Sequence, residues 1–157
     1  MLEGGCACGK VRYRLTSGPL FTHCCHCLNC QRQTGSAFVI NALIETDRIE
    51  LPAAEPQSVD VPRGGSTKQR IFRCPTCQVA VFSRYTRAGI RFVRGGTLDD
   101  PSAVTPDVHI YTRSKLSWVM LPDSVPAFRT YYDPQKLWPA ASLDRVKALT
   151  RSKRSHG

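Results

Sequence analysis

The sequence predicts a mostly β fold with one short helix near its C-terminal end. Three observations lead to this prediction: short alternating or β-branched runs dominate, Gly, Pro, Asp and Ser separate those runs, and helical periodicity is scarce. Of the 157 residues 41% are hydrophobic, which is enough for one domain with a buried core.

Five runs have the composition of strands. The first, Val11 to Leu15, alternates apolar and polar side chains, as expected of a half-buried strand. Pairs such as Gly18-Pro19 and Gly95-Gly96 provide turn signals between the runs. The predicted strands cover residues 11–15, 36–44, 68–73, 79–85 and 90–94.

Helix is expected at two places. One helical turn begins near Leu28, and a terminal helix begins with Ser142 as its N-cap and has an apolar face made by Leu143, Val146 and Leu149. Prolines recur between 101 and 139, which predicts a long irregular stretch. We expect one domain over residues 1–138 and a basic segment over 139–157, either a short helix or a frayed tail.

Composition argues against several classes of protein. No apolar run approaches the roughly 18 residues of a membrane span, and the N-terminus, with Glu3, does not resemble a signal peptide. We therefore expect a cytoplasmic protein with no membrane partner and with reduced cysteines. The net charge of +10 suits a small anionic ligand as well as a polyanion, although nucleic acid is the less favoured partner because no recognition helix stands out.

Seven of the eight cysteines fall into three clusters with the spacing of metal ligands. In the middle cluster Cys25 and Cys27 face the same side of an extended chain, and a turn brings Cys30 to them. Cys24 and His26 then point to the opposite side, although ligation by Cys24 stays open. Three thiolates leave one coordination position of a zinc ion free, whereas four close it.

The remaining cysteines form two pairs, Cys6 with Cys8 and Cys74 with Cys77. Each pair is too small to hold zinc alone. Together they would make a closed site and would tie the N-terminal strand to a segment far along the chain. Spacing alone leaves open which pairs share a metal.

Five ordered motifs resemble the glutathione-dependent formaldehyde-activating family, also called the CENP-V/GFA domain. The resemblance runs from about Gly4 to Trp138. The motifs are GGCACGKVRY at 4–13, CHCLNCQRQTGS at 25–36, FRCPTC at 72–77, GTLDDP at 96–101 and PDVHI at 106–110, the last followed by Ser114-Lys115 and Trp118.

The resemblance implies an Mss4-like fold of packed antiparallel sheets with zinc-stapled loops, and two zinc ions per chain. It also implies a carbon–sulfur lyase-type reaction that condenses formaldehyde with glutathione to S-hydroxymethylglutathione. It assigns the structural zinc to Cys6, Cys8, Cys74 and Cys77, and the second, reactive zinc to Cys25, Cys27 and Cys30.

An open zinc site lowers the pKa of a bound thiol, so it delivers a thiolate at neutral pH. Three anionic sulfurs also give the site a negative charge that weakens its action on a carbonyl oxygen. We therefore expect binding of a small thiol, such as glutathione, more than strong activation of the aldehyde. Arg32 and Lys115 are candidate partners for the substrate carboxylates.

The chain departs from the family pattern at two positions. Gln31 stands where the family often has a second arginine, and Gln78 stands where it often has glycine. A positive φ at Gln78 would cost roughly 1 kcal/mol.

Other candidate residues have structural interpretations. We expect Cys24 to be a small buried hydrophobe, His109 to be packed, Trp118 to be a core indole, and the 99–101 segment to be a turn with a helix cap. His23 and His26 are candidate acid–base groups beside the open zinc, although the orientation of their side chains argues against this role.

Three alternative functions share these residues. A non-enzymatic thiol carrier would bind thiols without accelerating adduct formation. A nucleic-acid-binding or cytoskeletal protein would use the basic surface, and a redox protein would use the C-x-x-C pairs.

Overall fold

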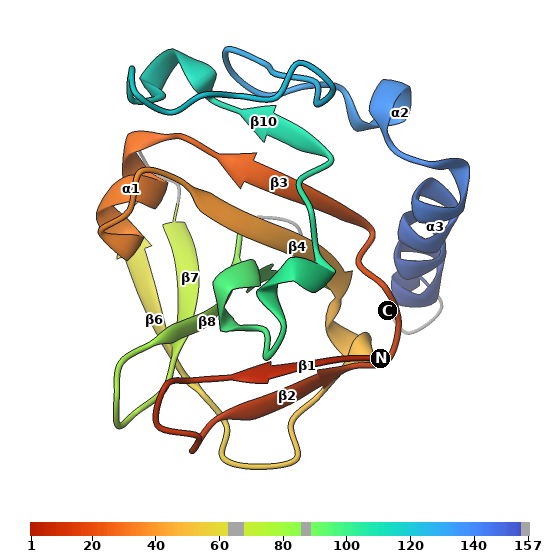
Figure 1. Cartoon of the computed structure of the whole chain (residues 1–157). Coiled ribbons are helices and arrows are strands. Elements are labelled where there is room, and N and C mark those ends of the chain that lie inside the picture. The colour runs from red at the N-terminus through yellow and green to blue at the C-terminus, as the bar shows by residue number, and fades with distance from the viewer. Residues whose placement is uncertain (63–67, 86–88, 155–157) are drawn as a thin grey trace.

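Two β-sheets of different size make up most of the fold (Figure 1). It is seen in a computed structural model that describes residues 1–62, 68–85 and 89–154. All neighbouring strands of the larger sheet are antiparallel except its first two, which are parallel. From one edge to the other its strands are β10 (Val108–Ile110), β3 (Phe21–Cys25), β4 (Val39–Glu45), β9 (Ile90–Arg94), β8 (Ala80–Arg84), β7 (Lys68–Arg73) and β6 (Gln57–Pro62).

The smaller sheet lies below β4 and β8 in Figure 1. Its order is β1 (Leu2–Gly5), β2 (Arg12–Leu15) and β5 (Ile49–Glu50). Gly4 is required in β1 because a Cβ there would lie 2.4 Å from both the carbonyl oxygen of Thr97 and the hydroxyl of Tyr13. This close approach brings the first cysteine turn against the large sheet.

Helices are short except for the last one. They are α1 (Leu28–Thr34), α2 (Pro134–Leu137) and α3 (Ala140–Arg154), with 3-10 turns η1 (Thr46–Arg48), η2 (Gly95–Thr97), η3 (Pro101–Ala103) and η4 (Thr112–Ser114). The α1 helix begins at Cys27, whose sulfur accepts from the Cys30 amide, and ends at Gly35, whose φ of 64° is the left-handed conformation of a helix C-cap. Within the described residues no helix is both long and apolar enough to cross a membrane.

The large sheet separates two hydrophobic clusters, because its side chains alternate between faces. On β4, Val39 and Leu43 join one cluster with Cys25 and Cys30, whereas Ala42 and Ile44 join the other. The second cluster contains the cysteines Cys6 and Cys74 and the smaller sheet's Tyr13. Each group of cysteines therefore belongs to its own core, on its own face of the sheet.

The strand predictions agree with the structure at their centres. Residues 68–73 and 90–94 form β7 and β9, and 79–85 contains β8. Strands β1, β3, β5, β6 and β10 were missed. Strand β3 is buried along its whole length and so shows no alternation. The mostly β class and the C-terminal helix are confirmed.

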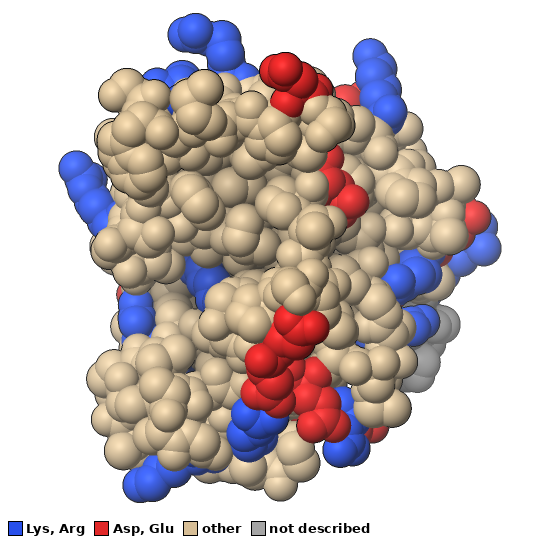
Figure 2. All heavy atoms as spheres, in the orientation of Figure 1, with Lys and Arg blue, Asp and Glu red and all other residues tan. Residues whose placement is uncertain are grey.

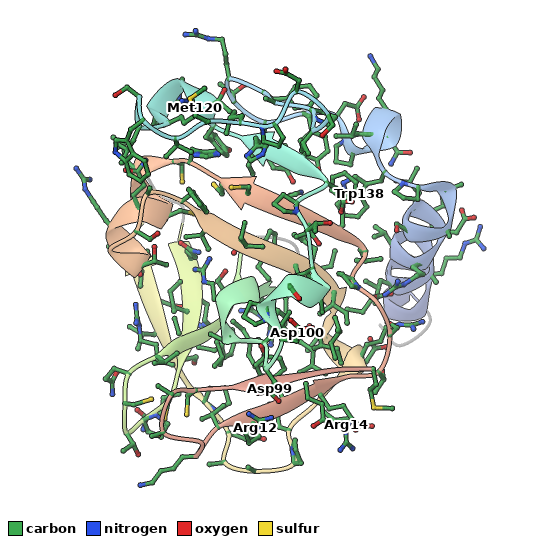
Figure 3. The ribbon with its side chains drawn as sticks, in the orientation of Figure 1. Arg12, Arg14, Asp99, Asp100, Met120 and Trp138 are labelled. Carbon is green, nitrogen blue, oxygen red and sulfur yellow. The ribbon has the colours of Figure 1, made fainter. Side chains whose placement is uncertain are left out.

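Two predictions about individual residues are wrong. Ser142 is not an N-cap, because α3 begins at Ala140 and the Ser142 hydroxyl instead donates to the carbonyl of Leu20 at 2.7 Å. Trp118 is not a core indole, since it is 69% exposed in the loop after η4. Met120, two residues further along this loop, is labelled in the upper part of Figure 3. The expectation for Asp100 is confirmed, since its side chain caps η3 by accepting from the Ser102 amide.

Charges on the visible face are dispersed and partly paired. In Figure 2 Lys and Arg side chains are scattered, and Asp and Glu side chains gather in the lower half beside basic ones. Arg12 pairs with Asp99 there, and Arg14 with Glu3. Among the residues coloured in this view there is no continuous basic stripe of the kind that follows a nucleic-acid backbone.

Helix α3 is docked on the first hydrophobic cluster. Val146 is buried there, and Leu143 and Leu149 pack against the cluster, so the predicted apolar face is the docking face. Arg145 donates to both carboxylate oxygens of Glu45 at the end of β4, at 2.7 and 2.5 Å. The Glu45 side chain is only 3% exposed, so this ion pair fastens the helix to the sheet.

Replacing Glu45 with glutamine is expected to lower the free energy of unfolding by roughly 2 kcal/mol, since hydrogen bonds to a charged group are lost. Burial alone would raise the pKa of Glu45, but its hydrogen bonds with Arg145 lower it below the ordinary 4.5. The stabilisation is therefore complete above about pH 4.5 and is lost as the pH falls further.

Urea unfolding of the wild type and Glu45→Gln between pH 7 and pH 3 tests this. The difference in the free energy of unfolding between the two proteins should become smaller at low pH. Asp144→Asn is the control, because Asp144 forms an exposed pair with Lys147 on the same helix and should change stability little. An equal difference at both pH values would contradict the prediction.

Candidate metal centres and the adjoining cavity

Four cysteines meet between the small sheet and the β7–β8 turn. The sulfurs of Cys6, Cys8, Cys74 and Cys77 all lie within 4.8 Å of one another, with Cys6 to Cys8 at 3.5 Å and Cys8 to Cys74 at 3.7 Å. Four sulfurs around one zinc at about 2.3 Å would lie roughly 3.8 Å apart. The observed spacing therefore fits a closed tetrahedral metal site.

Two turns with similar hydrogen bonds present these sulfurs. In the first, the Cys6 amide donates to the Val11 carbonyl and the Val11 amide donates to the Cys6 sulfur. In the second, the Cys74 amide donates to Val79 and the Thr76 amide donates to the Cys74 sulfur. Amides directed at the sulfurs favour thiolates, and Cys6 shows this: burial opposes its ionisation, but the Val11 amide and the neighbouring sulfurs lower its pKa to about 6.

Each turn needs one left-handed residue. Gly9 fills that position in the first turn with φ 74°, and Gln78 fills it in the second with φ 62°. The Gln78 amide donates to the Cys74 carbonyl, as the Gly9 amide does to Cys6. The sequence analysis predicted strain at Gln78 if its φ were positive, and the structure shows this positive φ.

Gln78→Gly is therefore expected to raise the free energy of unfolding by about 0.5–1 kcal/mol, because glycine adopts this conformation without strain. Gly9→Ala is the reciprocal variant, since an added Cβ there meets no heavy atom within 4 Å and only backbone strain remains. It should lose about 1 kcal/mol. Urea unfolding of the metal-loaded proteins measures both, and a destabilised Gln78→Gly would contradict the strain argument.

The second group of sulfurs belongs to Cys25, Cys27 and Cys30, which also lie within 4.8 Å of one another. Cys25 ends β3, and α1 carries the other two at its N-cap and in its first turn. Cys25 and Cys30 are buried, whereas Cys27 is partly exposed. The same cluster of sulfurs raises the pKa of Cys25 through contact with Cys27 and Cys30 and through burial, so a positive ion is needed to hold all three as thiolates.

A cavity of about 280 Å³ opens beside this group and is lined by Cys25 and Cys27. Strands β3, β4 and β9 form its floor, and the segment from Ile110 to Trp138 forms its other wall. Trp138, labelled in Figure 3, lies beside α2 at that wall. The described lining residues are His23, Cys25, Cys27, Asn41, Leu43, Tyr85, Ile90, Phe92, Ile110, Tyr111, Tyr131, Pro134 and Trp138.

The cavity wall includes His23, contrary to the orientation argument from sequence. His23 lies two residues before Cys25 on the same strand, so both side chains face the same side of the sheet. Its Nε2 lies 2.6 Å from the Tyr132 hydroxyl, and burial lowers its pKa to about 4. His23 is therefore a neutral, hydrogen-bonded ring at pH 7.

The opposite side of the same segment holds a third group of donors. Cys24 Sγ lies 3.5 Å from His26 Nε2, which lies 3.1 Å from His109 Nδ1, and all three residues are buried. Burial raises the pKa of Cys24 to about 12, and burial with the charges of His109 and Lys115 lowers the pKa of His26 to about 4. Cys24 is thus a buried neutral thiol turned away from the three-cysteine group, as predicted, whereas the contact between His26 and His109 was not predicted.

The candidate carboxylate partners do not line the cavity. Arg32 is exposed on α1, and the ammonium of Lys115 donates to the carbonyls of Leu116 and Val119 at 3.1 and 2.7 Å. Gln31 has a structural role. Its side-chain amide nitrogen Nε2 donates to the backbone carbonyls of His26 and Ser114, and these hydrogen bonds join α1 to the η4 turn.

Comparison with known families decides what this arrangement belongs to. The family model described as "Glutathione-dependent formaldehyde-activating enzyme" matches residues 1–114, which include all eight cysteines. The chain belongs to the glutathione-dependent formaldehyde-activating family. The matched region contains the three cysteines of the cavity and the four of the closed group, whereas the aromatic residues after Ile110 lie mostly outside it.

Other comparisons add little to the family assignment. Among curated proteins no significant match is found. A protein of Rhodobacter sphaeroides with a known crystal structure is 18% identical in sequence to this chain. The matched region covers 80% of this chain and 99% of the other, with a TM-score of 0.49. That similarity is too distant to bear on function.

Sequence reasoning missed most of the cavity wall in this member of the formaldehyde-activating family. Tyr85, Phe92, Tyr111 and Tyr131 come from three separate parts of the chain and form no motif. The one available signal was the aromatic content of the irregular stretch after Ile110.

Proposed function

We propose that the protein is a zinc-dependent carbon–sulfur lyase-type enzyme that joins a small thiol to a small aldehyde. One observation carries this proposal: the sulfurs of Cys25, Cys27 and Cys30 gather at a cavity, while Cys24 is turned away toward His26. Three sulfurs leave a metal one position for a ligand from the cavity.

Two zinc ions per chain fit the two all-cysteine groups. Cys6, Cys8, Cys74 and Cys77 would hold a structural zinc, and Cys25, Cys27 and Cys30 would hold the reactive one. All-thiolate donor sets favour zinc over hard cations. When bound at the three-cysteine group, zinc supplies positive charge that favours the ionised form of an incoming thiol.

The proposed reaction is an addition that needs no oxidant or reductant. The thiol sulfur attacks the aldehyde carbon and forms a carbon–sulfur bond, the π electron pair moves to oxygen, and oxygen takes the proton that the thiol releases. The chain's own residues orient the reactants: Cys25 and Cys27 face the cavity, and Leu43, Ile90 and Ile110 exclude water from its inner wall.

Several finer assignments rest on the family resemblance. They are an Mss4-like fold, a domain that ends at residue 138 with 139–157 as an appended segment, glutathione and formaldehyde as substrates, and substrate carboxylates held by Arg32 and Lys115. For the last of these, the ammonium of Lys115 would have to leave the carbonyls of Leu116 and Val119.

A thiol carrier with the same site is the second candidate. It is favoured by the cavity wall, whose described residues include no carboxylate, and by His23, which is held neutral against Tyr132. With no carboxylate and no protonated histidine at the described wall, the tyrosine hydroxyls are the main remaining proton donors for an addition already easy in water.

Two measurements on freshly purified protein test the proposal. Metal content by mass spectrometry should be two zinc ions per chain, and adduct formation from formaldehyde and a thiol should exceed the uncatalysed rate. Saturable thiol binding with only the uncatalysed rate would select the carrier. One zinc per chain, with no thiol binding, would refute both, and a third metal would indicate that Cys24, His26 and His109 also bind one.

A further inference from the structure

We propose that the cavity beside Cys25 and Cys27 selects a neutral thiol or thiol adduct with an aromatic substituent, in place of the glutathione that the family resemblance implies. This inference rests on the proposed function, because it takes the three-cysteine group as the place where the sulfur of the ligand binds. It is argued from the shape and charge of the cavity wall.

Aromatic rings dominate the wall. Tyr85 and Phe92 meet edge to face with centroids 4.6 Å apart, and Tyr111 and Tyr131 lie 6.3 Å apart on the other side. Trp138 closes the wall next to α2. Side chains of this kind bind another ring by offset or edge-to-face contact, which adds to the gain from removing apolar surface from water.

The rings are held in place before any ligand binds. Tyr111 has φ 56°, a left-handed conformation that a bulky residue rarely adopts, and its amide donates to the Thr130 carbonyl. Tyr131 stacks on Tyr132 at 4.8 Å and 18° between planes. Backbone strain of this sort collects at functional sites, where it fixes a side chain that the site uses.

Charge argues against a tripeptide in this cavity. No Lys, Arg, Asp or Glu lines it among the residues that the structure describes. Three thiolates around a divalent metal carry one net negative charge, and glutathione brings two carboxylates and one ammonium. A carboxylate placed near that charge, in an apolar wall without a cation, loses hydration and gains no partner.

Two polar side chains of the wall, those of Asn41 and His23, already have hydrogen-bond partners. Asn41 Oδ1 accepts from Arg94 at 2.5 Å, and His23 Nε2 is held by the Tyr132 hydroxyl at 2.6 Å. Arg94 is itself buried and is not part of the lining. The described wall therefore offers mainly rings and sulfur to a ligand, which suits a neutral thiol with an aromatic substituent.

Calorimetry on the zinc-loaded protein with four probes tests the inference. Benzyl mercaptan has ring and thiol, 2-mercaptoethanol has thiol without ring, benzyl alcohol has ring without thiol, and glutathione has a charged thiol. We expect benzyl mercaptan to bind at least tenfold more tightly than each of the others. Trp138 reports the location, because Trp118→Phe leaves it as the only tryptophan of the chain and its fluorescence should then change with benzyl mercaptan.

A pair of variants tests the wall itself. Tyr131→Ala removes a lining ring that is 43% exposed, so the fold should tolerate the change. This variant should bind benzyl mercaptan about tenfold more weakly and should keep its affinity for 2-mercaptoethanol. Met120→Ala, at a residue 86% exposed and outside the lining, is the control and should change neither.

The outcomes separate this inference from the proposed function. Glutathione binding as tightly as benzyl mercaptan would overturn the aromatic selectivity and leave thiol binding in place. Benzyl alcohol binding as tightly as benzyl mercaptan would confirm the aromatic cavity and overturn the role of the sulfur. No binding heat with any thiol would overturn both.

Discussion

Replacing Cys27 with serine is expected to remove one of the two metals and to weaken thiol binding by at least a hundredfold, while the protein stays folded. Cys27 contributes one of the three sulfurs at the cavity, and two sulfurs are too few to hold zinc firmly. The fold should survive because Cys27 is also the N-cap of α1, and serine is a preferred N-cap whose oxygen can accept from the Cys30 amide.

Metal content, thiol affinity and thermal unfolding of the same preparation check this result. Cys24→Ala is the matched control, because Cys24 is the neighbouring cysteine that faces His26, and it should keep two metals and full thiol binding. If Cys27→Ser kept both metals and its thiol affinity, the three-cysteine group would not be the thiol site.

Replacing Cys74 with serine is expected to destabilise the fold, whereas Cys27→Ser is expected mainly to weaken thiol binding. Cys74 has no exposed surface, lies in the second hydrophobic cluster, and joins the β7–β8 turn to Cys8 in the N-terminal turn, 66 residues away. Metal binding there is coupled to folding, and loss of the metal leaves a polar serine in an apolar core. We expect the free energy of unfolding to fall by about 4 kcal/mol or more, and Tm by roughly 10 °C or more.

Thermal unfolding with and without a strong chelator measures this effect. The chelator should lower the Tm of the wild type toward that of Cys74→Ser. It should change the Tm of Cys74→Ser little through the closed site, because the variant has already lost the metal there. Thr76→Ala is the control, since Thr76 is exposed in the same turn and only its backbone amide meets the Cys74 sulfur. A variant as stable as the wild type would mean that the closed group holds no structural metal.

The two variants together distinguish a structural from a reactive role for the cysteines. The distinction follows from where each group lies: the four-cysteine group ties the small sheet to the turn between two strands, whereas the three-cysteine group borders a cavity. A redox role for the C-x-x-C pair would instead predict loss of metal on mild oxidation, with turnover supported by a reductase.

The sequence by itself predicted three clusters of cysteines and the separation of Cys24 from Cys25, Cys27 and Cys30, and the family resemblance supplied the pairing of Cys6 and Cys8 with Cys74 and Cys77. The extended geometry assumed for residues 24–27 placed Cys24 and His26 opposite Cys25 and Cys27, because successive side chains of an extended chain face opposite ways. Local spacing also predicted the turn at Leu28 and the apolar face of α3. These features depend only on residues close together in the chain.

Only the tertiary structure decided what surrounds the three sulfurs. The cavity rings come from β8, β9 and the irregular stretch after β10, and no local pattern marks residues that meet only after the sheets pack. His23 against Tyr132, and His26 against His109, are likewise contacts between residues 109 and 83 positions apart. The cysteine clusters could be predicted because candidate metal ligands recur at short spacings, whereas the cavity wall depends on long-range packing that single residues do not encode.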